Sequence, residues 1–503
     1  MKMAKEKGKK EGKEQGISID ELAAFCKRKG FVFPSGEIYG SLAGFWDFGP
    51  VGVELKNNLK RDWWNFFIRA RDDMAGIDGS ILTHPRVWAA SGHVENFSDM
   101  SVICKKCKKV SKIDRFEIDK AVCNLCGGEL DKKSAKDLNL MFKTQVGPIK
   151  ENSVESYLRP ETAQLIFANF KNIAECSRLK LPFGIGQIGK AFRNEIAPRD
   201  FLFRSREFEQ MEIEYFIFPD EKCPYKIPDI SISVYSAEMQ AKGKEAREMK
   251  IKEALEEGVV RRDWHAYWLS QCLLWFKSLG CDLGNFRIRQ HKKDELAHYS
   301  SDCWDIEYKF PFGWKELTGI ADRSDYDLKR HEQFSGKDLK IFVEGKGKIL
   351  PHVVCEPSFG VERAFLVVML EAYEHDKKRE NIVLHLAPNI APIKAAVFPI
   401  VKDEKMIKLS EEIYKELRKE WSASYDERGS IGRRYARADE SGTPMCITVD
   451  EQSLKDKNVT IRWRDTTEQV RVKISELRDI LRKVINEGQN VFKLGRRINT
   501  RVK

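Results

Sequence analysis

The stretch GKAFRNEIAPRDFLFRSREFEQMEIEYF, residues 189–216, decides the fold, because it has the pattern of two β-strands joined by a long loop. Beyond Phe208, apolar and polar residues alternate, so they lie on opposite faces of the predicted strand. The apolar face carries Met211, Ile213, Tyr215 and Ile217, and the polar face carries Gln210, Glu212 and Glu214. In the strand before the loop, Arg193 and Glu195 share a face. One sheet face therefore suits an anionic, aromatic ligand with an ammonium group nearby, although a hairpin braced by surface salt bridges has the same pattern.

Length and charge limit the class of protein. A chain of 503 residues is too long for one hydrophobic core, which predicts roughly three domains. No apolar run approaches the ~20 residues of a membrane span, so no membrane partner is expected. The formal net charge of +11 favours a polyanionic partner without proving one.

The N-terminus, MKMAKEKGKKEGKEQG, is basic and lacks the apolar region of a secretory signal. We interpret residues 1–18 as a disordered basic tail, with a weak nucleic-acid arm as the alternative.

The rest of the chain changes pattern several times. Periodicity predicts a short helix over 17–30, a long helix over 51–75, and a strand, glycine turn and apolar helix over 350–373. Residues 219–280 are rich in Lys, Glu and Ala, which indicates a helical segment. Beyond the polar link at 374–381, strands and helices alternate over roughly 110 residues, the size of a small α/β domain.

Four of the twelve cysteines form two pairs, Cys104-x2-Cys107 and Cys123-x2-Cys126, separated by fifteen residues. Two such knuckles let four thiolates converge on one zinc ion, and a site filled by four protein ligands is structural. The alternatives are four unrelated thiols or a redox pair. The other cysteines are scattered singly, which indicates a reducing compartment.

Three separated stretches combine a glycine–proline turn into a helix, the charged hairpin, and a strand that ends in a glycine turn. They are GFWDFGPVGVELKNNLKRDWW (44–64), FRNE followed by RSREF (192–208), and EPSFGVERAF (356–365). In this order they resemble motifs 1, 2 and 3 of the class II aminoacyl-tRNA synthetases.

Further segments narrow the resemblance to the α2-type glycyl-tRNA synthetases, over about residues 20–490. These segments are ASGHVENFSD (90–99), YLRPETAQ (157–164), RNEIAPR (193–199), REFEQMEIEYF (206–216), RQHKKDELAHYSSDCWD (289–305), WKELTGIADRSDYDL (314–328) and EPSFG (356–360). RRYARADESGTP (433–444) resembles that family's anticodon-binding domain.

The resemblance implies an α+β fold: an antiparallel class II catalytic sheet with helices, a zinc-ribbon insertion and a C-terminal α/β anticodon-binding domain. The expected divisions are the tail (1–18), a first catalytic part with motif 1 (19–100), the zinc ribbon (101–135), a second catalytic part with motif 2 (136–218), a helical insertion (219–280), a third catalytic part with motif 3 (281–380) and the anticodon-binding domain (381–503).

The resemblance also assigns an ATP site. Arg193 and Arg363 are the expected catalytic residues: Arg193 should hold the α-phosphate and the amino-acid carboxylate, and Arg363 should cover adenine and reach the γ-phosphate. A guanidinium can stabilise charge that develops on a phosphate. Phe208 should stack on the other face of adenine and Glu195 accept from its amino group. The remaining members of the implied ATP site are Asn194, Arg204, Ser205, Glu316 and Leu317, with Glu316 as an Mg²⁺ ligand.

Glycine has no side chain to grip, so its selection must depend on its ammonium group and on excluding larger residues. The positions that match the family's glycine contacts, or flank them, are Glu161, Glu212, Glu356, Pro357 and Ser358. Taken alone, Glu161 or Glu212 would be interpreted as a buried salt-bridge partner.

Two features fall outside these assignments. His93 and His298 lie in matching segments, and we interpret both as structural hydrogen-bonding residues. Motif 3 often has the form G-x-G-x-x-R, whereas here Glu362 replaces the second glycine and the position of Arg363 is kept. An acidic residue near a helix N-terminus is acceptable, so only the local helix entry is in doubt.

The implied activity is the ATP-dependent attachment of glycine to tRNA(Gly), by a cytoplasmic homodimer with Trp46, Phe48 and Pro50 near the subunit interface. One alternative is a synthetase for threonine, proline, serine or histidine, which the ammonium-binding glutamates and EPSFG disfavour. The other is an inactive synthetase-like protein that serves as a nucleic-acid-binding or polymerase-accessory subunit. The presence of Arg193, Arg204 and Arg363 argues against the second alternative.

Overall fold

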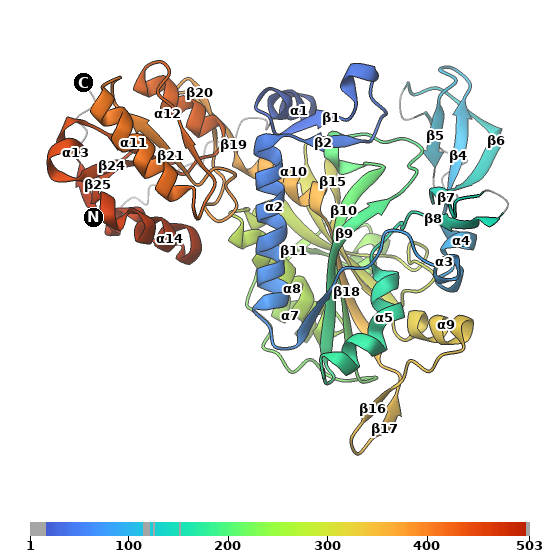
Figure 1. Cartoon of the computed structure of the whole chain (residues 1–503). Helices are drawn as coiled ribbons and strands as arrows, with labels where there is room; N and C mark the ends of the chain where they lie inside the picture. The colour runs from blue at the N-terminus through green and yellow to red at the C-terminus, as the bar shows by residue number, and fades with distance from the viewer. Residues whose placement is uncertain (1–16, 114–120, 124–125, 150–151, 499–503) are drawn as a thin grey trace, which may run out of the picture.

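The computed structural model of the chain describes residues 17–113, 121–123, 126–149 and 152–498. The predicted basic tail lies almost wholly outside these residues. A large sheet with helices on both faces forms the centre, a small three-stranded sheet lies at one corner, and a separate α/β unit forms the C-terminal part (Figure 1). The α+β prediction with these three parts is confirmed.

The central sheet has nine strands and is mostly antiparallel; only the pairs β11–β13 and β3–β9 are parallel. In spatial order its strands are β12 (Arg247–Lys250), β11 (Ser231–Tyr235), β13 (Phe286–Gln290), β14 (Asp302–Phe310), β15 (Gly313–Asp322), β18 (His352–Gly360), β10 (Glu207–Ile217), β9 (Phe183–Phe192) and β3 (Met74–Ile77). The two strands of the opening hairpin, β9 and β10, therefore lie beside β18, which carries EPSFG.

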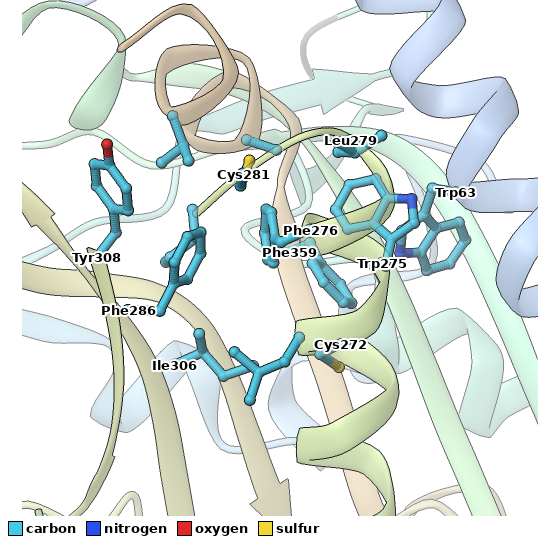
Figure 2. Close-up of a cluster of buried hydrophobic side chains, with 14 of the residues drawn as sticks. Trp63, Cys272, Trp275, Phe276, Leu279, Cys281, Phe286, Ile306, Tyr308 and Phe359 are labelled. Carbon is cyan, nitrogen blue, oxygen red and sulfur yellow. The ribbon is translucent and has the colours of Figure 1, made fainter. Parts of the chain in front are cut away.

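One face of this sheet packs against α2 (Pro50–Trp64), α8 (Asp263–Ser278) and α10 (Val361–Ala372). Aromatic rings fill the space, with Trp275 of α8 centred 5.3 Å from Phe359 of β18 (Figure 2). Because side chains alternate along a strand, burying Phe359 in this core directs Ser358 to the opposite face. The core therefore fixes which residues of β18 reach the site.

Helix α2 is shorter than the predicted helix over 51–75. It starts at Pro50, a residue suited to the first turn of a helix. After Trp64 it widens into one π-helical turn, Asn65–Arg69, and the chain then turns into β3.

The other face of the sheet is covered by α5 (Ala163–Cys176) and α9 (Tyr326–Ser335) around a second apolar cluster. The predicted polar face of β10 is consequently buried: the exposed fractions of Glu212 and Glu214 are 1% and 0%.

The segment 219–280 differs from the predicted helical insertion. It contributes β11 and β12 to the edge of the central sheet as well as α6 (Ala237–Ala241) and α7 (Ile251–Glu256). Its main helix, α8, is rich in Trp, Tyr and Leu and is buried in the principal core. Lys/Glu composition averaged over the segment concealed this apolar helix.

The cysteine region forms a three-stranded sheet of β5 (Val110–Ile113), β4 (Ser98–Cys104) and β6 (Leu130–Asn139), at the upper right of Figure 1. The shorter elements that precede the C-terminal unit include α1 (Ile19–Arg28), β1 (Val32–Pro34), β2 (Trp46–Phe48), α3 (Pro85–Ala90), α4 (His93–Asn96), β7 (Lys143–Val146), β8 (Val154–Tyr157), β16 (Ile341–Val343), β17 (Gly347–Ile349), β19 (Tyr373–Asp376) and β20 (Asn381–Leu384).

The C-terminal unit is a six-stranded sheet with helices and its own apolar core. Its strands, in spatial order, are β22 (Ala423–Tyr425), β21 (Ala395–Pro399), β23 (Met445–Val449), β24 (Asn458–Trp463), β25 (Gln469–Lys473) and β26 (Arg496–Ile498). Its helices are α11 (Glu404–Leu417), α12 (Ile431–Glu440), α13 (Glu451–Asp456) and α14 (Leu477–Glu487).

Within the described ranges, none of the helices combines the length and apolar character needed to cross a bilayer.

Candidate active site

All the residues predicted to bind glycine except Pro357 meet on the face of the central sheet that α5 and α9 cover. Glu212 of β10 lies directly opposite Ser358 of β18, whose hydroxyl donates a 2.7 Å hydrogen bond to Glu212 Oε1. The Thr162 amide donates to the other oxygen, Oε2, at 3.1 Å. These donors fix the Glu212 carboxylate in one orientation.

Glu161 lies just before α5 and is held by groups from several elements. His93 Nε2 is 3.2 Å from Glu161 Oε2, and the Gln164 amide donates to Oε1 at 2.9 Å. His93 Nδ1 in turn lies 2.7 Å from the Ser91 hydroxyl. His93 therefore hydrogen-bonds a predicted glycine ligand, while His298 contacts the Ser91 carbonyl at 3.4 Å.

Arg323, at the end of β15, is the main cation of this cluster and was not assigned from the sequence. It donates to Glu356 Oε1 at 2.9 Å and to Asp327 Oδ2 at 2.7 Å, and its guanidinium lies 3.7 Å from the centre of the Tyr299 ring. It is 1% exposed. The spacing of Arg323 and Asp327, one helical turn apart at the end of an apolar strand, is the signal that could have revealed it.

The pKa values of the buried carboxylates are shifted in different directions. Burial raises the pKa of Glu356 to about 8, assisted by the charges of Glu212 and Glu161 and opposed by Arg323. Burial and neighbouring Glu161 raise the pKa of Glu212, and burial with neighbouring Glu356 raises that of Glu214 well above its usual range. For Glu161, burial is outweighed by the charges of His93 and Arg323, which hold its pKa well below usual. The cluster has more carboxylates than cations, which suits an ammonium ligand.

Glu214 shows most clearly that this cluster has too few cations and donors for its carboxylates. It is fully buried beside Glu356, and neither of its carboxylate oxygens has a hydrogen-bond partner among the described residues.

The residues predicted to bind ATP lie at the end of the sheet where the β9–β10 loop begins. Strand β9 ends at Phe192, so the prediction that Arg193 and Glu195 lie within the strand is wrong. The Arg193 guanidinium is 5.3 Å from the centre of the Phe208 ring and donates to the Pro160 carbonyl at 3.0 Å. The cation and ring predicted to hold one nucleotide are therefore adjacent.

Several polar groups of this loop are unsatisfied. Glu195 Oε2 and Ser205 Oγ are buried and find no hydrogen-bond partner within the described part of the chain. Arg204 Nε lies 4.0 Å from Glu195 Oε2. The Asn194 backbone amide donates to the Leu140 carbonyl at 2.7 Å, which ties the loop to the end of the cysteine region.

Arg363, on the first turn of α10, reaches β15. It donates to the Glu316 carbonyl at 3.0 Å, lies 3.3 Å from Glu316 Oε1, and covers the Phe203 ring at 4.6 Å. The Glu316 side chain is half exposed.

Two predicted site residues face away from the site. Leu317 is 1% exposed and belongs to the principal core, because it follows Glu316 on the strand and points to the other face. Pro357 pairs with the core residue Ile320 in the β15–β18 register, so it also lies on the core face, between Glu356 and Ser358 on the site face. Motif resemblance identified the segment but did not distinguish its faces.

Counted back from Arg363, the glycines of G-x-G-x-x-R fall at positions 358 and 360, so the departure from motif 3 lies at Ser358 and not at Glu362. Glu362 has a definite role in the packing. Its carboxylate accepts from Lys56 Nζ at 2.8 Å and from the Glu209 amide at 2.8 Å. Lys56 also contacts Glu209 Oε1 at 2.7 Å. This triad of Lys56, Glu209 and Glu362 links α2, β10 and α10, the carriers of the three motifs, so the doubt about helix entry is resolved.

The four clustered cysteines converge. The sulfur atoms of Cys104 and Cys126 are 3.6 Å apart, as are those of Cys107 and Cys123, and all four lie within 4.8 Å of one another. A Cβ on Gly128 would be 3.2 Å from two of these sulfurs, so a side chain there would crowd the cluster. This donor set fits a tetrahedral thiolate-bound metal.

The fold and site together define a class II aminoacyl-tRNA synthetase: a mostly antiparallel sheet brings the three motifs together, and an α/β domain follows. A family model described as an anticodon binding domain matches residues 394–484. A glycine–tRNA ligase of Treponema denticola is 44% identical over 92% of this chain and 96% of its own length. The ligase of Geobacillus kaustophilus is 44% identical over 93% of this chain and 99% of its own length. The ligase of Caldanaerobacter subterraneus is 43% identical over 92% of this chain and 97% of its own length. The chain belongs to the glycine–tRNA ligase family.

Proposed function

We propose that this chain activates glycine with ATP to glycyl-adenylate and pyrophosphate, and then transfers the glycyl group to tRNA(Gly), releasing AMP. The observation that carries the proposal is the meeting of two sets of residues on one sheet: a buried carboxylate cluster and an arginine-rich nucleotide end. The glycine–tRNA ligases to which the chain is similar over more than nine-tenths of its length support the same activity.

At the nucleotide end, Arg193 would neutralise the charge that develops on the α-phosphate when the glycine carboxylate attacks it. Phe208 and Arg363 would sandwich adenine, with Glu195 and Asn194 at its rim, and Arg204 and Ser205 would approach the β- and γ-phosphates. The substrates supply the nucleophile and the leaving group, so catalysis depends on positioning and electrostatics. The unpartnered oxygens of Glu195 and Ser205 support this role, because a bound nucleotide would supply their missing partners.

At the glycine end, Glu161, Glu212 and Glu356 would surround the ammonium group together with Ser358. Because Glu212 and Ser358 are already hydrogen-bonded to each other, a substrate side chain would have to separate them. An apolar side chain would in addition be placed among desolvated charges.

Pyrophosphate exchange with individual amino acids tests the proposal. We expect exchange with glycine and none above background with serine, threonine, proline or histidine. Exchange with one of these instead of glycine would reassign the substrate, and no exchange with any amino acid would favour the accessory-protein alternative.

Two metals complete the proposal. Magnesium bound to ATP would neutralise the pyrophosphate leaving group, and the half-exposed Glu316 carboxylate is an oxygen ligand that suits it. Zinc at Cys104, Cys107, Cys123 and Cys126 would stabilise the three-stranded sheet. We expect one zinc per chain to disappear in Cys104→Ser, measured by elemental analysis, and retention of that zinc would refute the site.

We further propose a cytoplasmic homodimer that binds tRNA(Gly) through the C-terminal domain. The twelve cysteines, all among the described residues, are unbridged, which agrees with a reducing compartment. Near Trp46 and Phe48, the exposed fractions of Ile38, Tyr39 and Leu42 are 87%, 89% and 74%, a concentration of apolar surface suited to a subunit contact. Sedimentation equilibrium would test the dimer, and Tyr39→Asp should weaken it.

A further inference from the structure

A second group of metal-ligating side chains lies on the central sheet, well away in sequence from the cysteine ribbon. Its members are His291, Cys303 and Asp305, and one potential ligand atom from each lies within 4.8 Å of the others. The segments that contain them matched the family without receiving a role in the proposed mechanism.

The backbone arranges these residues rigidly. Cys303 and Asp305 are two positions apart on β14 and therefore point to the same face. His291 directly follows β13, and its amide donates to the Cys303 carbonyl at 2.9 Å, so it lies beside Cys303 on the neighbouring strand. Two ligands on one strand and a third on its neighbour form a three-ligand metal site without any loop rearrangement.

The side chains of the three residues are close together, two of them are buried, and one imidazole nitrogen lacks a partner among the described residues. His291 Nε2 lies 2.7 Å from Asp305 Oδ2, while His291 Nδ1 is buried and has no partner in the described ranges. The exposed fractions of Cys303 and Asp305 are 8% and 5%.

The neighbouring strand β15 presents a glycine, not a side chain, to Asp305. Gly319 lies opposite Asp305 in the β14–β15 register and opposite Ser358 in the β15–β18 register. A Cβ on Gly319 would be 3.7 Å from Asp305 Oδ1 and 3.9 Å from Glu316 Oε1. The Asp305 carboxylate is therefore not covered by a side chain at position 319.

The nearest arginine does not rule out a cation. Arg289 Nη1 is 4.0 Å from Asp305 Oδ2, but its Nη2 contacts both oxygens of Glu295, at 2.6 and 2.7 Å. Its charge is therefore already matched by Glu295.

We propose that His291, Cys303 and Asp305 bind a divalent cation of the zinc type, separate from the four-cysteine site and open at one coordination position. Imidazole and thiolate ligands select zinc or cobalt over magnesium. Binding forms bonds from the metal to nitrogen, sulfur and oxygen, and it releases the thiol proton of Cys303 to solvent. The proposal is independent of which amino acid the enzyme activates.

Cobalt titration of the full-length protein, with zinc already in the four-cysteine site, tests the proposal. We expect one cobalt per chain to bind with a near-ultraviolet thiolate-to-cobalt absorption band and no release of zinc. In Cys303→Ser the band should disappear, and in His291→Ala cobalt affinity should fall at least tenfold. Cys355→Ser, a buried cysteine in the principal core, is the matched control and should keep the band.

Two results would overturn the proposal. One is the absence of the band at a large excess of cobalt in a protein that is folded by circular dichroism. The other is a band that persists in Cys303→Ser, or that appears together with released zinc, since the cobalt would then occupy the four-cysteine site. If Cys303→Ser fails to fold, Asp305→Asn replaces it and should weaken cobalt binding at least tenfold; unchanged binding would refute Asp305 as a ligand.

Discussion

The glycine end and the nucleotide end of the site differ in how completely their polar groups are already paired. At the glycine end, the two predicted glycine ligands Glu161 and Glu212 are buried and accept hydrogen bonds from neighbouring side chains, whereas the neighbouring Glu214 has no such partner among the described residues. At the nucleotide end, Glu195 and Ser205 keep unpartnered atoms among the described residues, and Glu316 is half exposed. The glycine end is therefore built as part of the folded core, whereas the nucleotide end is completed by its ligand.

This difference has a physical reason. A ligand without a side chain offers few contacts, so the pocket cannot rely on the ligand to order it and must be preorganised. ATP offers a ring and three phosphates, which can order flexible arginines on binding. Substitutions at the nucleotide end should therefore reduce activity alone, and substitutions at the glycine end should reduce activity and stability together.

The largest effect is expected from Arg193→Ala. Loss of a charged donor aimed at the reacting phosphate should lower the rate of pyrophosphate exchange by about 10³-fold. The melting temperature should stay unchanged, because within the described part of the chain the Arg193 side chain makes a single hydrogen bond, to the Pro160 carbonyl. Arg199→Ala, in the same loop but about half exposed, should leave exchange near normal. Near-normal exchange in Arg193→Ala would refute its role.

Sequence reasoning located the segments of the site, but it did not always predict which face of a strand a residue occupies. Motif resemblance predicted Glu161, Glu212 and Ser358 as glycine contacts, and alternation had in addition placed Glu212 on the polar face of its strand. The same reasoning placed Leu317 and Pro357 in the site, although both face the core. Motif spacing locates a segment, but the β14–β15 register passes from Glu316 to Thr318 and leaves Leu317 as a bulge on β15, which shifts the alternation of faces beyond it.

Contacts between residues that are far apart in the chain were the other limit on prediction from the sequence. Nothing in the segment around Arg323 indicates that it meets Glu356, 33 positions later. The edge strands β11 and β12 were likewise missed: β11 alternates polar and apolar residues, but it is short and lies in a segment whose Lys/Glu composition indicates helix, and its pairing with β13 could not be read from the sequence. The cysteine ribbon was easier to predict because metal-ligand spacing is encoded locally.

The second largest effect is expected from Glu161→Gln, at the glycine end. The KM for glycine should rise by ~10²-fold, because the ammonium group loses an ionised partner. The free energy of unfolding should fall by about 3 kcal/mol, because buried Arg323 and His93 lose a counter-charge. Thermal and urea denaturation measure the second effect. Glu175→Gln, exposed near the end of α5, is the control, and an unchanged stability in Glu161→Gln would contradict the contrast between the two ends.

The third prediction concerns pH. Because burial raises the pKa of Glu356 to about 8, the native protein holds a proton there that the unfolded chain lacks above its ordinary value of 4.5. The free energy of unfolding contributed by this group should therefore decrease as pH rises from about 4.5 to 8. Glycine's ammonium prefers the ionised carboxylate, so the KM for glycine should fall up to ~10-fold per pH unit below pH 8 and level off above it.

Pyrophosphate exchange measured at several pH values checks this behaviour, with the KM for ATP followed in the same experiments as an internal reference. In Glu356→Gln the dependence of the glycine KM on pH should flatten. A profile that is already flat in the unmodified protein would show that Glu356 does not change its charge when glycine binds.

The smallest expected effect tests whether the nucleotide end has a preorganised part after all. Lys56 joins Glu209 and Glu362, which adjoin Phe208 and Arg363 in the chain. Lys56→Met should leave two buried carboxylates unpaired, raise the KM for ATP by about fivefold and leave the KM for glycine unchanged. Lys60→Met is the matched control, because Lys60 lies on the same helix and contacts Glu209 alone, at 2.9 Å. Adding Glu362→Gln to Lys56→Met should recover part of the lost stability. If both KM values rose equally, the triad would merely support the fold, and the two ends of the site would be less independent than their hydrogen bonding indicates.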